Sequence, residues 1–310
     1  MYENFGKGAV EPTVLTNPIY LCFFAFISTI IVTLLIMFTA FLSSKIDGKV
    51  NWNWASVFSP LFIVDIIILI ILLYQACHSP DDESMEKEER KEKKNSNFWP
   101  FMYRTFKFLL FSIFHVLLAL RLDENIKDWV SVWIPIFILE GFLFIEILIE
   151  CRAHFQTISG CGLFFKLLKL FIFWGCRVLQ EVFIALRSDR IVMWEWSTVA
   201  IPIILALSLN FIIGCIEDRV IISSLQDENQ KSQMKSASQG KECCQIILGV
   251  LFFSFLGMLI VHLDNGYRTA SIILIPIFIF LSFICLCCCC CLPCVYCMIS
   301  LSSDDQENQF

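Results

Sequence analysis

The sequence is short of charged residues. They make up 17% of the 310 residues, while hydrophobic residues make up 57%; an average soluble domain has about 25% and roughly 45–50%. The 31 Phe residues add to this apolar excess. The composition therefore excludes a water-soluble globular protein and predicts a chain that crosses a lipid bilayer several times.

The sequence also lacks the motifs of the common enzyme classes. It contains no His–Glu pair at zincin spacing, no G-x-S-x-G, no P-loop and no glycine-rich dinucleotide turn. Its four His residues are scattered, so they do not suggest a metal site. We therefore expect a protein that is not an enzyme, holds no metal or cofactor and binds no nucleic acid.

Eight apolar segments are long enough to span a bilayer, for which about 20 residues are needed. They cover residues 18–42, 55–77, 98–120, 130–150, 163–186, 195–216, 243–262 and 271–297. The fifth segment is the least apolar, because it contains Lys166, Lys169, Arg177 and Glu181. We predict an all-α integral membrane protein with eight transmembrane helices.

A motif recurs in the four short loops between successive spans. It consists of a basic residue, any residue and Asp, followed 13, 12, 13 and 12 residues later by a Pro. Its members are Lys45, Asp47 and Pro60; Arg121, Asp123 and Pro135; Arg187, Asp189 and Pro202; and His262, Asp264 and Pro276. The recurrence predicts four parallel helical hairpin repeats that form two duplicated four-helix halves.

These repeats divide the chain into four hairpins, three linkers and two terminal segments. The first to fourth repeats cover residues 18–77, 98–150, 163–216 and 242–297. The linkers are a charged segment (78–97), a short segment (151–162) and a polar segment (217–241), and the terminal segments are 1–17 and 298–310. The mixed-charge run in 78–97 predicts a solvated helix or a disordered linker, and the Gln/Ser-rich 217–241 predicts a flexible one.

The distribution of Lys and Arg predicts the orientation. The side that holds the linkers and both termini has fifteen of them, and the side with the short loops has seven. Since cytosolic segments carry the excess of positive charge, both termini are predicted to be cytosolic.

Several stretches of the repeats resemble a known family. FHVLLALRLDENIKDWVSVWIPIFILE (114–140) and VFIALRSDRIVMWEWSTVAIPIIL (182–205) resemble the repeat of the transmembrane protein 185 family, also called transmembrane fragile-X-F-associated proteins. KIDGKVNWNWASVFSPLFIVD (45–65) resembles transmembrane protein 60, a small relative. The resemblance implies a multipass protein of the endoplasmic reticulum or another endomembrane, rather than the plasma membrane. It implies no established activity and no catalytic or binding residues.

The loop motif has two interpretations. In the structural one, the basic residue complements the dipole of the helix that ends there, and the Asp hydrogen-bonds nearby amides as a turn or cap. Trp residues at the following boundary then belong to the aromatic belt, and the Pro is accommodated by packing. In the functional one, four Asp residues form a lumenal ring that collects cations.

Ionisable residues within the spans form a second set of candidates, because charge is costly in a bilayer. Asp65 and Glu140 each lie five residues after the Pro of their repeat, and His115 and Glu181 each lie eight residues before an Asp of the motif. Arg177 and Glu181 have the i, i+4 spacing of an ion pair on one helix. The set either makes polar packing contacts between helices or forms a proton or cation pathway.

Half of the 16 Cys residues lie in 285–297, and none lies in the short loops. A disulfide framework would require the reverse. The run Cys287, Cys288, Cys289, Cys290 and Cys291 is a candidate palmitoylation tract beside the membrane. Metal binding and simple apolar filling are the alternatives.

These observations predict a non-enzymatic scaffold or regulatory membrane protein. Its environment is the lipid bilayer, and its polar linkers offer binding sites for cytosolic or membrane protein partners. The alternative is a transporter or channel in which Asp65, Glu140 and Glu181 converge on a cavity.

Overall fold

The computed structural model describes residues 18–77, 87–157, 161–224, 228–266 and 269–287. These residues form helices joined by short loops, and no strand occurs among them. The predicted all-α class is therefore confirmed. The terminal segments 1–17 and 298–310, and the candidate palmitoylation residues Cys288 to Cys291, lie outside the described residues.

The described part of the chain contains a series of long helices and two single-turn helices. They are α2 (Pro18–Ile46), α3 (Trp54–Cys77), α4 (Lys87–Leu122), α5 (Trp129–Thr157), α6 (Cys161–Ser188), α7 (Trp196–Val199), α8 (Ile201–Ser224), α9 (Glu228–Asn265), α10 (Ala270–Ile273) and α11 (Ile275–Leu286).

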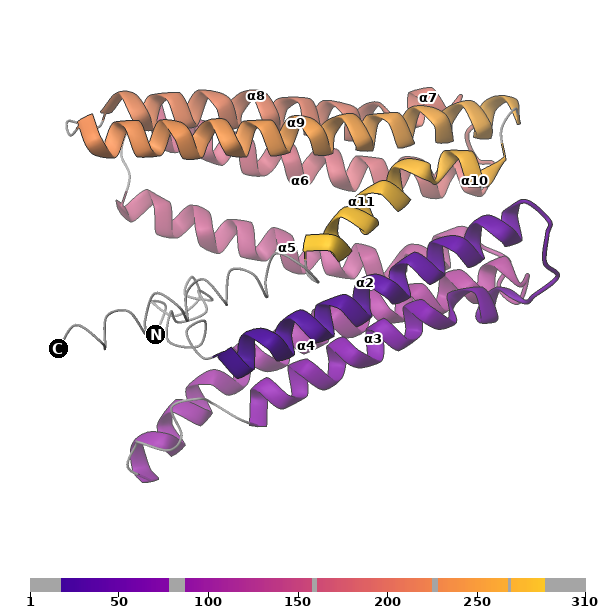
Figure 1. Cartoon of the computed structure of the whole chain (residues 1–310), viewed down its shortest axis with the longest axis horizontal. Coiled ribbons are helices and arrows are strands. Elements are labelled where there is room, and N and C mark those ends of the chain that lie inside the picture. Colours follow the sequence, from indigo (N-terminus) through magenta and orange to yellow (C-terminus); the bar gives the residue numbers. More distant parts are fainter. Residues whose placement is uncertain (1–17, 78–86, 158–160, 225–227, 267–268, 288–310) are drawn as a thin grey trace, which may run out of the picture. The chain divides into compact units, whose positions relative to one another are not determined.

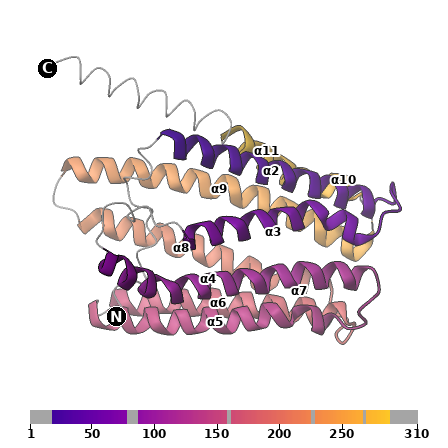
Figure 2. The same ribbon diagram turned by 90° about the horizontal axis from the view of Figure 1, so that it is seen from below.

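The helix contacts divide the chain into two units. The first unit contains the described residues up to Ser112 and from Leu274 onward, and in it α2 packs against both α3 and α11 (Figure 1). The second unit runs from Ile113 to Ile273. In it α5 packs against α6, α6 against α8 and α8 against α9; Figure 1 shows the last three side by side, and Figure 2 shows α5 beside α6.

Six stretches of helix are long and apolar enough to cross a membrane. They are Phe23–Ile46, Trp54–Gln75, Phe98–Leu122, Trp129–Arg152, Trp196–Ile216 and Ser238–Asn265. They coincide with six of the eight predicted spans. The other two predicted spans fall in α6, which carries four charged residues within 163–186, and in α11, which is a shorter apolar helix. The helices therefore belong to an integral multipass membrane protein.

The residue three positions before each motif Pro is buried in every repeat. These residues are Val57, Val132, Val199 and Ile273, with exposed fractions of 0, 0, 1 and 3%. Other apolar side chains, such as Ile66 and Ile70, are exposed. Apolar residues both between the helices and on their outer faces are expected for helices packed in a lipid bilayer. The repeats therefore place the same position in the core each time.

The polar segment 217–241 differs from its prediction as a flexible linker. The helix α8 extends to Ser224, and α9 begins at Glu228, so most of the segment is helical. The segment has no Pro and a single Gly, and its Gln, Lys, Glu and Met residues favour helix. Because the apolar helices on both sides supply the costly nucleus, these residues can extend them. In the charged linker 78–97, α4 likewise begins at Lys87.

Candidate functional site

The first three short loops end their helices with the same backbone turn. After α6, the Arg190 N–H donates to the Arg187 carbonyl (3.1 Å) and the Ile191 N–H to the Leu186 carbonyl (3.0 Å). This is the Schellman arrangement, which requires a left-handed residue just after the helix. That residue directly follows the motif Asp in each loop: Gly48 (φ 68°), Glu124 (φ 62°) and Arg190 (φ 58°). The turn reverses the chain and holds the motif Asp at a fixed position.

The carboxylate of Asp189 caps a helix of another repeat. It accepts hydrogen bonds from the backbone N–H groups of Trp129 (2.8 Å) and Val130 (3.1 Å). Because Trp129 is the first residue of α5, these N–H groups have no partner within that helix. The structural interpretation predicted a cap on a nearby amide, whereas the amides that Asp189 binds belong to the second repeat. Asp189 thus joins the second and third repeats.

The same contact recurs between the third and fourth repeats. The Asp264 carboxylate accepts a hydrogen bond of 3.0 Å from the backbone N–H of Trp196, the first residue of α7. Trp196 and Trp129 occupy equivalent positions in their repeats. We call these two contacts the loop caps. In both, the Asp of one repeat binds the start of the second helix of the preceding repeat.

The basic residue of the motif lies over the same Trp that begins the following helix. The distances from cation to ring centroid are 5.7 Å for Lys45 and Trp54, 4.9 Å for Arg121 and Trp129, and 5.5 Å for Arg187 and Trp196. Such cation–π contacts stabilise the turn within one repeat. Sequence reasoning assigned these Trp residues only to the aromatic belt. The nearly constant offset of 9, 8 and 9 residues from cation to Trp is the signal that could have revealed the contact.

The motif Pro has two structural outcomes. Pro60 and Pro135 lie inside the continuous helices α3 and α5. Pro202 and Pro276 each occupy the second position of a new helix, after the breaks at Ala200 and Leu274. These breaks give two repeats an additional helix start, whose first N–H groups need partners.

Gln180 of α6 supplies one such partner. Its Oε1 accepts a hydrogen bond of 3.1 Å from the backbone N–H of Ile203, directly after Pro202. The contact satisfies an amide in the first turn of α8, as the membrane environment requires. Sequence reasoning did not single out Gln180. An uncharged polar residue within the apolar segment 163–186 was the available signal.

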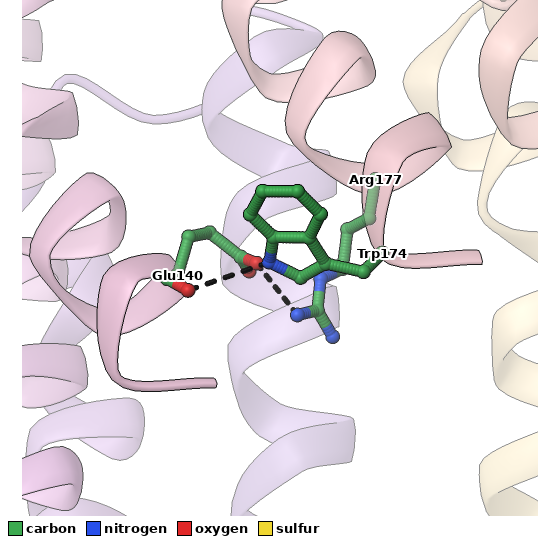
Figure 3. Close-up of polar contacts among 3 residues, drawn as sticks. All are labelled: Glu140, Trp174 and Arg177. Carbon is green, nitrogen blue, oxygen red and sulfur yellow. Dashed lines mark hydrogen bonds and ion pairs between the residues drawn. The ribbon is translucent and has the colours of Figure 1, made fainter. Parts of the chain in front are cut away.

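A second set of polar side chains lies midway along α5 and α6. It consists of Glu140, Trp174, Arg177 and Glu181, and we call it the mid-helix cluster. The Glu140 side chain is buried, and its Oε2 lies 2.6 Å from Nη2 of Arg177 (Figure 3). The indole N–H of Trp174 donates to the backbone carbonyl of Glu140 at 3.3 Å. The Trp174 ring also packs on Phe144, with the centroids 4.6 Å apart. The cluster thus ties α5 to α6 by charge, hydrogen bond and ring packing.

The partner of Arg177 corrects a sequence prediction. The i, i+4 spacing predicted that Arg177 pairs with Glu181 on its own helix, but its guanidinium bonds Glu140 on α5. A buried carboxylate that loses its counter-charge is costly, whereas an i, i+4 pair along one helix contributes little, so the interhelical contact prevails. Glu181 lies one turn after Arg177 on α6, close enough to Glu140 for the two carboxyl groups to interact electrostatically.

The comparisons with known proteins identify the family. The sequence matches the family model described as transmembrane fragile-X-F protein over residues 9–128 and 44–287, which together cover most of the chain. The chain belongs to the transmembrane fragile-X-F protein family. The predicted resemblance is thereby confirmed, and with the six apolar helices it shows an integral multipass membrane protein of this family. No solved structure matches the chain.

The remaining candidates of this transmembrane fragile-X-F protein lie in different helices. Asp65 of α3 and His115 of α4 are both buried, with exposed fractions of 8 and 7%. The Asp47 side chain is also buried, and its Oδ2 lies 3.2 Å from Nζ of Lys49. Of the five intramembrane candidates, Glu140, Arg177 and Glu181 are the three that meet within the second unit.

The cysteines and possible metal ligands do not gather into one site among the described residues. Within the described ranges, no group of three or more His, Cys, Asp or Glu side chains is placed to hold a metal. Cys287, the first residue of the candidate palmitoylation tract, is half-buried. Cys243 and Cys244 lie near the start of the apolar part of α9, and both are exposed.

Proposed function

We propose that this transmembrane fragile-X-F protein is a non-enzymatic scaffold or regulatory membrane protein. The observation that carries the proposal is the binding of the buried Glu140 carboxylate by Arg177, at 2.6 Å across two helices. A group that transports a substrate must bind and release it repeatedly, whereas this carboxylate is committed to holding α5 and α6 together. The loop caps commit two further carboxylates to contacts between repeats.

The proposal includes eight spans arranged as four parallel hairpins in two duplicated halves. The contacts of α6 with both α5 and α8 support a span there. Two of the charges of α6 are also accommodated, Arg177 by Glu140 and Arg187 by the ring of Trp196. The two family matches overlap over residues 44–128, as is expected when the family's pattern recurs within a chain.

The polar extensions of α4 and α9 are the proposed partner-binding elements. Both helices begin in polar sequence, at Lys87 and Glu228, before their apolar parts start at Phe98 and Ser238. Lys235 and Ser236 of α9 are exposed. A helix that continues beyond the bilayer presents such side chains at fixed spacing to a cytosolic or membrane protein partner. We place these extensions in the cytosol and the protein in the endoplasmic reticulum or another endomembrane.

A matched pair of insertions tests this orientation. A Gly/Ser insert of about 20 residues that carries one Asn-x-Thr sequon is placed after Asn125 in one variant and after Asn229 in the other. Because only the lumenal side is glycosylated, the first insert should gain a glycan that endoglycosidase removes, and the second should not. The reverse pattern would overturn the proposed topology.

The second candidate function is a proton or cation transporter or channel that uses Asp65, Glu140 and Glu181. Two buried atoms of the mid-helix cluster favour it. Oε2 of Glu181 and Nε of Arg177 have no hydrogen-bond partner among the residues that the structure describes. Uncompensated polar atoms in a helix bundle can mark a place where an ion or proton binds.

Flux measurements separate the two candidates. Purified full-length protein is reconstituted into liposomes containing a pH-sensitive dye, and proton entry after a pH jump is followed with and without a potassium ionophore. A scaffold should leave the rate equal to that of empty liposomes. Flux that is present in the wild type and lost in Glu140→Gln and Glu181→Gln would establish the transporter, provided that the variants insert normally.

A further inference from the structure

A pocket of about 680 Å³ opens at the loops of the second unit, between the turn after α4 and the turn after α6. Three cationic side chains line it: Arg121, Lys127 and Arg190. Two carboxylates, Asp128 and Asp189, are also in its lining. The pocket is separate from the mid-helix cluster, and neither of the two candidate functions above uses it.

The charges of this pocket favour an anion. Each oxygen of Asp189 already accepts a backbone N–H from the start of α5, where the helix dipole partly compensates its charge. The lining still carries three cations against two carboxylates, of which Asp189 is already engaged by these N–H groups. The excess of positive charge in a concave surface attracts and holds anions.

Arg121 offers its terminal N–H groups to a ligand. Its guanidinium carbon lies over the Trp129 ring, 4.9 Å from the ring centroid. Its Nε is buried, so the terminal Nη groups are the donors that a ligand in the pocket would reach. A planar guanidinium of this kind binds the oxygens of a phosphate in pairs.

Arg190 is held at the pocket by an unfavourable backbone conformation. Its φ of 58° is in the left-handed region, which glycine adopts more easily than arginine does. The equivalent residue of the first loop is Gly48, with a φ of 68°. A cationic side chain at a position that suits glycine is a reason to look for a function of that side chain.

The rest of the lining suits an amphipathic ligand. The hydroxyl-bearing residues Ser131 and Ser188 lie beside the cations, and Val130 and Ile191 add apolar surface. The pocket also lies at the start of α5, where the apolar stretch Trp129–Arg152 begins. Donors next to apolar residues at the end of a span match the headgroup and the glycerol region of a lipid.

We propose that this loop pocket binds the phosphate group of an anionic phospholipid through Arg121, Lys127 and Arg190. Inorganic phosphate shares the chemistry that these residues recognise, so the test separates the two sources. The proposal is independent of whether the protein is a scaffold or a transporter.

Native mass spectrometry of the purified full-length protein in detergent measures the binding. The probes are phosphatidic acid, phosphatidylcholine and inorganic phosphate. The test variant is Lys127→Gln with Arg190→Gly, because Lys127 is exposed and glycine suits the backbone of position 190. The control is Lys49→Gln, which removes an exposed cation from the first short loop, outside this pocket. Each cation lost should weaken phosphatidic acid binding about fivefold, or about 25-fold for the pair, and the control should bind as the wild type does.

Each outcome decides the proposal. Phosphatidic acid that binds the wild type and the control, but is about 25-fold weaker on the test variant, supports it. Competition by inorganic phosphate at equal concentration supports phosphate recognition and assigns the site to a soluble ligand instead of a lipid. Equal binding to wild type and test variant, or equal binding of phosphatidylcholine and phosphatidic acid, overturns it. If the test variant elutes from gel filtration as the control does and melts at no lower temperature, a folding defect does not explain the loss of binding.

Discussion

The loop caps and the mid-helix cluster both join neighbouring repeats of the second unit, but they do so by different chemistry. In the loop caps, Asp189 and Asp264 bind backbone N–H groups. In the mid-helix cluster, Glu140 binds a side chain, the guanidinium of Arg177. Every helix start offers free N–H groups, so a motif Asp finds a partner whatever the neighbouring side chains are. A mid-helix carboxylate needs one particular side chain opposite it.

This difference explains which polar residues recur in the sequence. The motif Asp is present in all four repeats, whereas the position of Glu140 is Asp65 in the first repeat and Leu207 and Leu281 in the third and fourth. A contact that depends on backbone survives duplication and divergence without a matching change elsewhere. A contact between two side chains requires both to be kept. The comparison predicts that the mid-helix contact is energetically strong and specific, and that each loop cap is weaker.

The largest effect should come from Arg177→Met. It leaves the buried Glu140 without its counter-charge, which should lower the free energy of unfolding by about 3–5 kcal/mol. The double variant Arg177→Met with Glu140→Gln removes both charges and should recover most of that loss. Unfolding in detergent micelles titrated with SDS measures both. A double variant as unstable as the single one would mean that Arg177 acts by packing and not by charge.

The two loop caps should be weaker and graded by their hydrogen bonds. Asp189→Ala removes two bonds to α5 and should cost about 2 kcal/mol, while Asp264→Ala removes one bond to α7 and should cost about 1 kcal/mol. The same SDS titration measures the difference. Asn at either position retains an acceptor and should cost less than Ala. Equal costs for the two Ala variants would show that the bond from Asp189 to Val130 adds no stability.

The sequence predicted the residues of the loop motif but not where they bind. The recurrence of a basic residue, Asp and Pro located the turns correctly, and the loop interpretation included capping by Asp. It did not show that Asp189 caps α5, since the spacing within a repeat contains no information on which helix of another repeat lies beside it. The partners of Arg177 and Gln180 were missed for the same reason, because both cross between helices.

The sequence predicts those helices that are marked by long apolar segments. Six of the eight predicted spans coincide with long apolar helices. The segment that includes Lys235 and Ser236 was predicted to be a flexible linker from its polarity, yet it is part of α9. Polarity indicates that a segment is in water, and it does not decide whether the backbone continues a helix that is already nucleated.

The cap of α8 by Gln180 should have an intermediate to small effect. Gln180→Leu keeps the volume but leaves the Ile203 N–H without its acceptor, which should cost about 1 kcal/mol. The control is Gln239→Leu, the same substitution at an exposed position of α9, which should leave the stability unchanged. Thermal unfolding in detergent compares the two. If both variants melt as the wild type does, the break before Pro202 does not depend on Gln180.

Small effects should come from the turns that hold the motif Asp. Arg190 and Glu124 have left-handed backbones, and Arg190→Gly or Glu124→Gly removes the strain of that conformation. Glycine also raises the entropy of the unfolded chain, which offsets part of the gain. Each substitution should therefore raise the free energy of unfolding by about 0.5 kcal/mol. Gly48→Ala tests the same strain in the opposite direction. A Cβ at Gly48 would meet no atom within 4 Å, so its expected cost of about 1 kcal/mol comes from the backbone alone. Melting temperatures in detergent should rise for the first two variants and fall for the third. If Gly48→Ala is neutral, the left-handed backbone of the first loop carries no energetic cost for alanine.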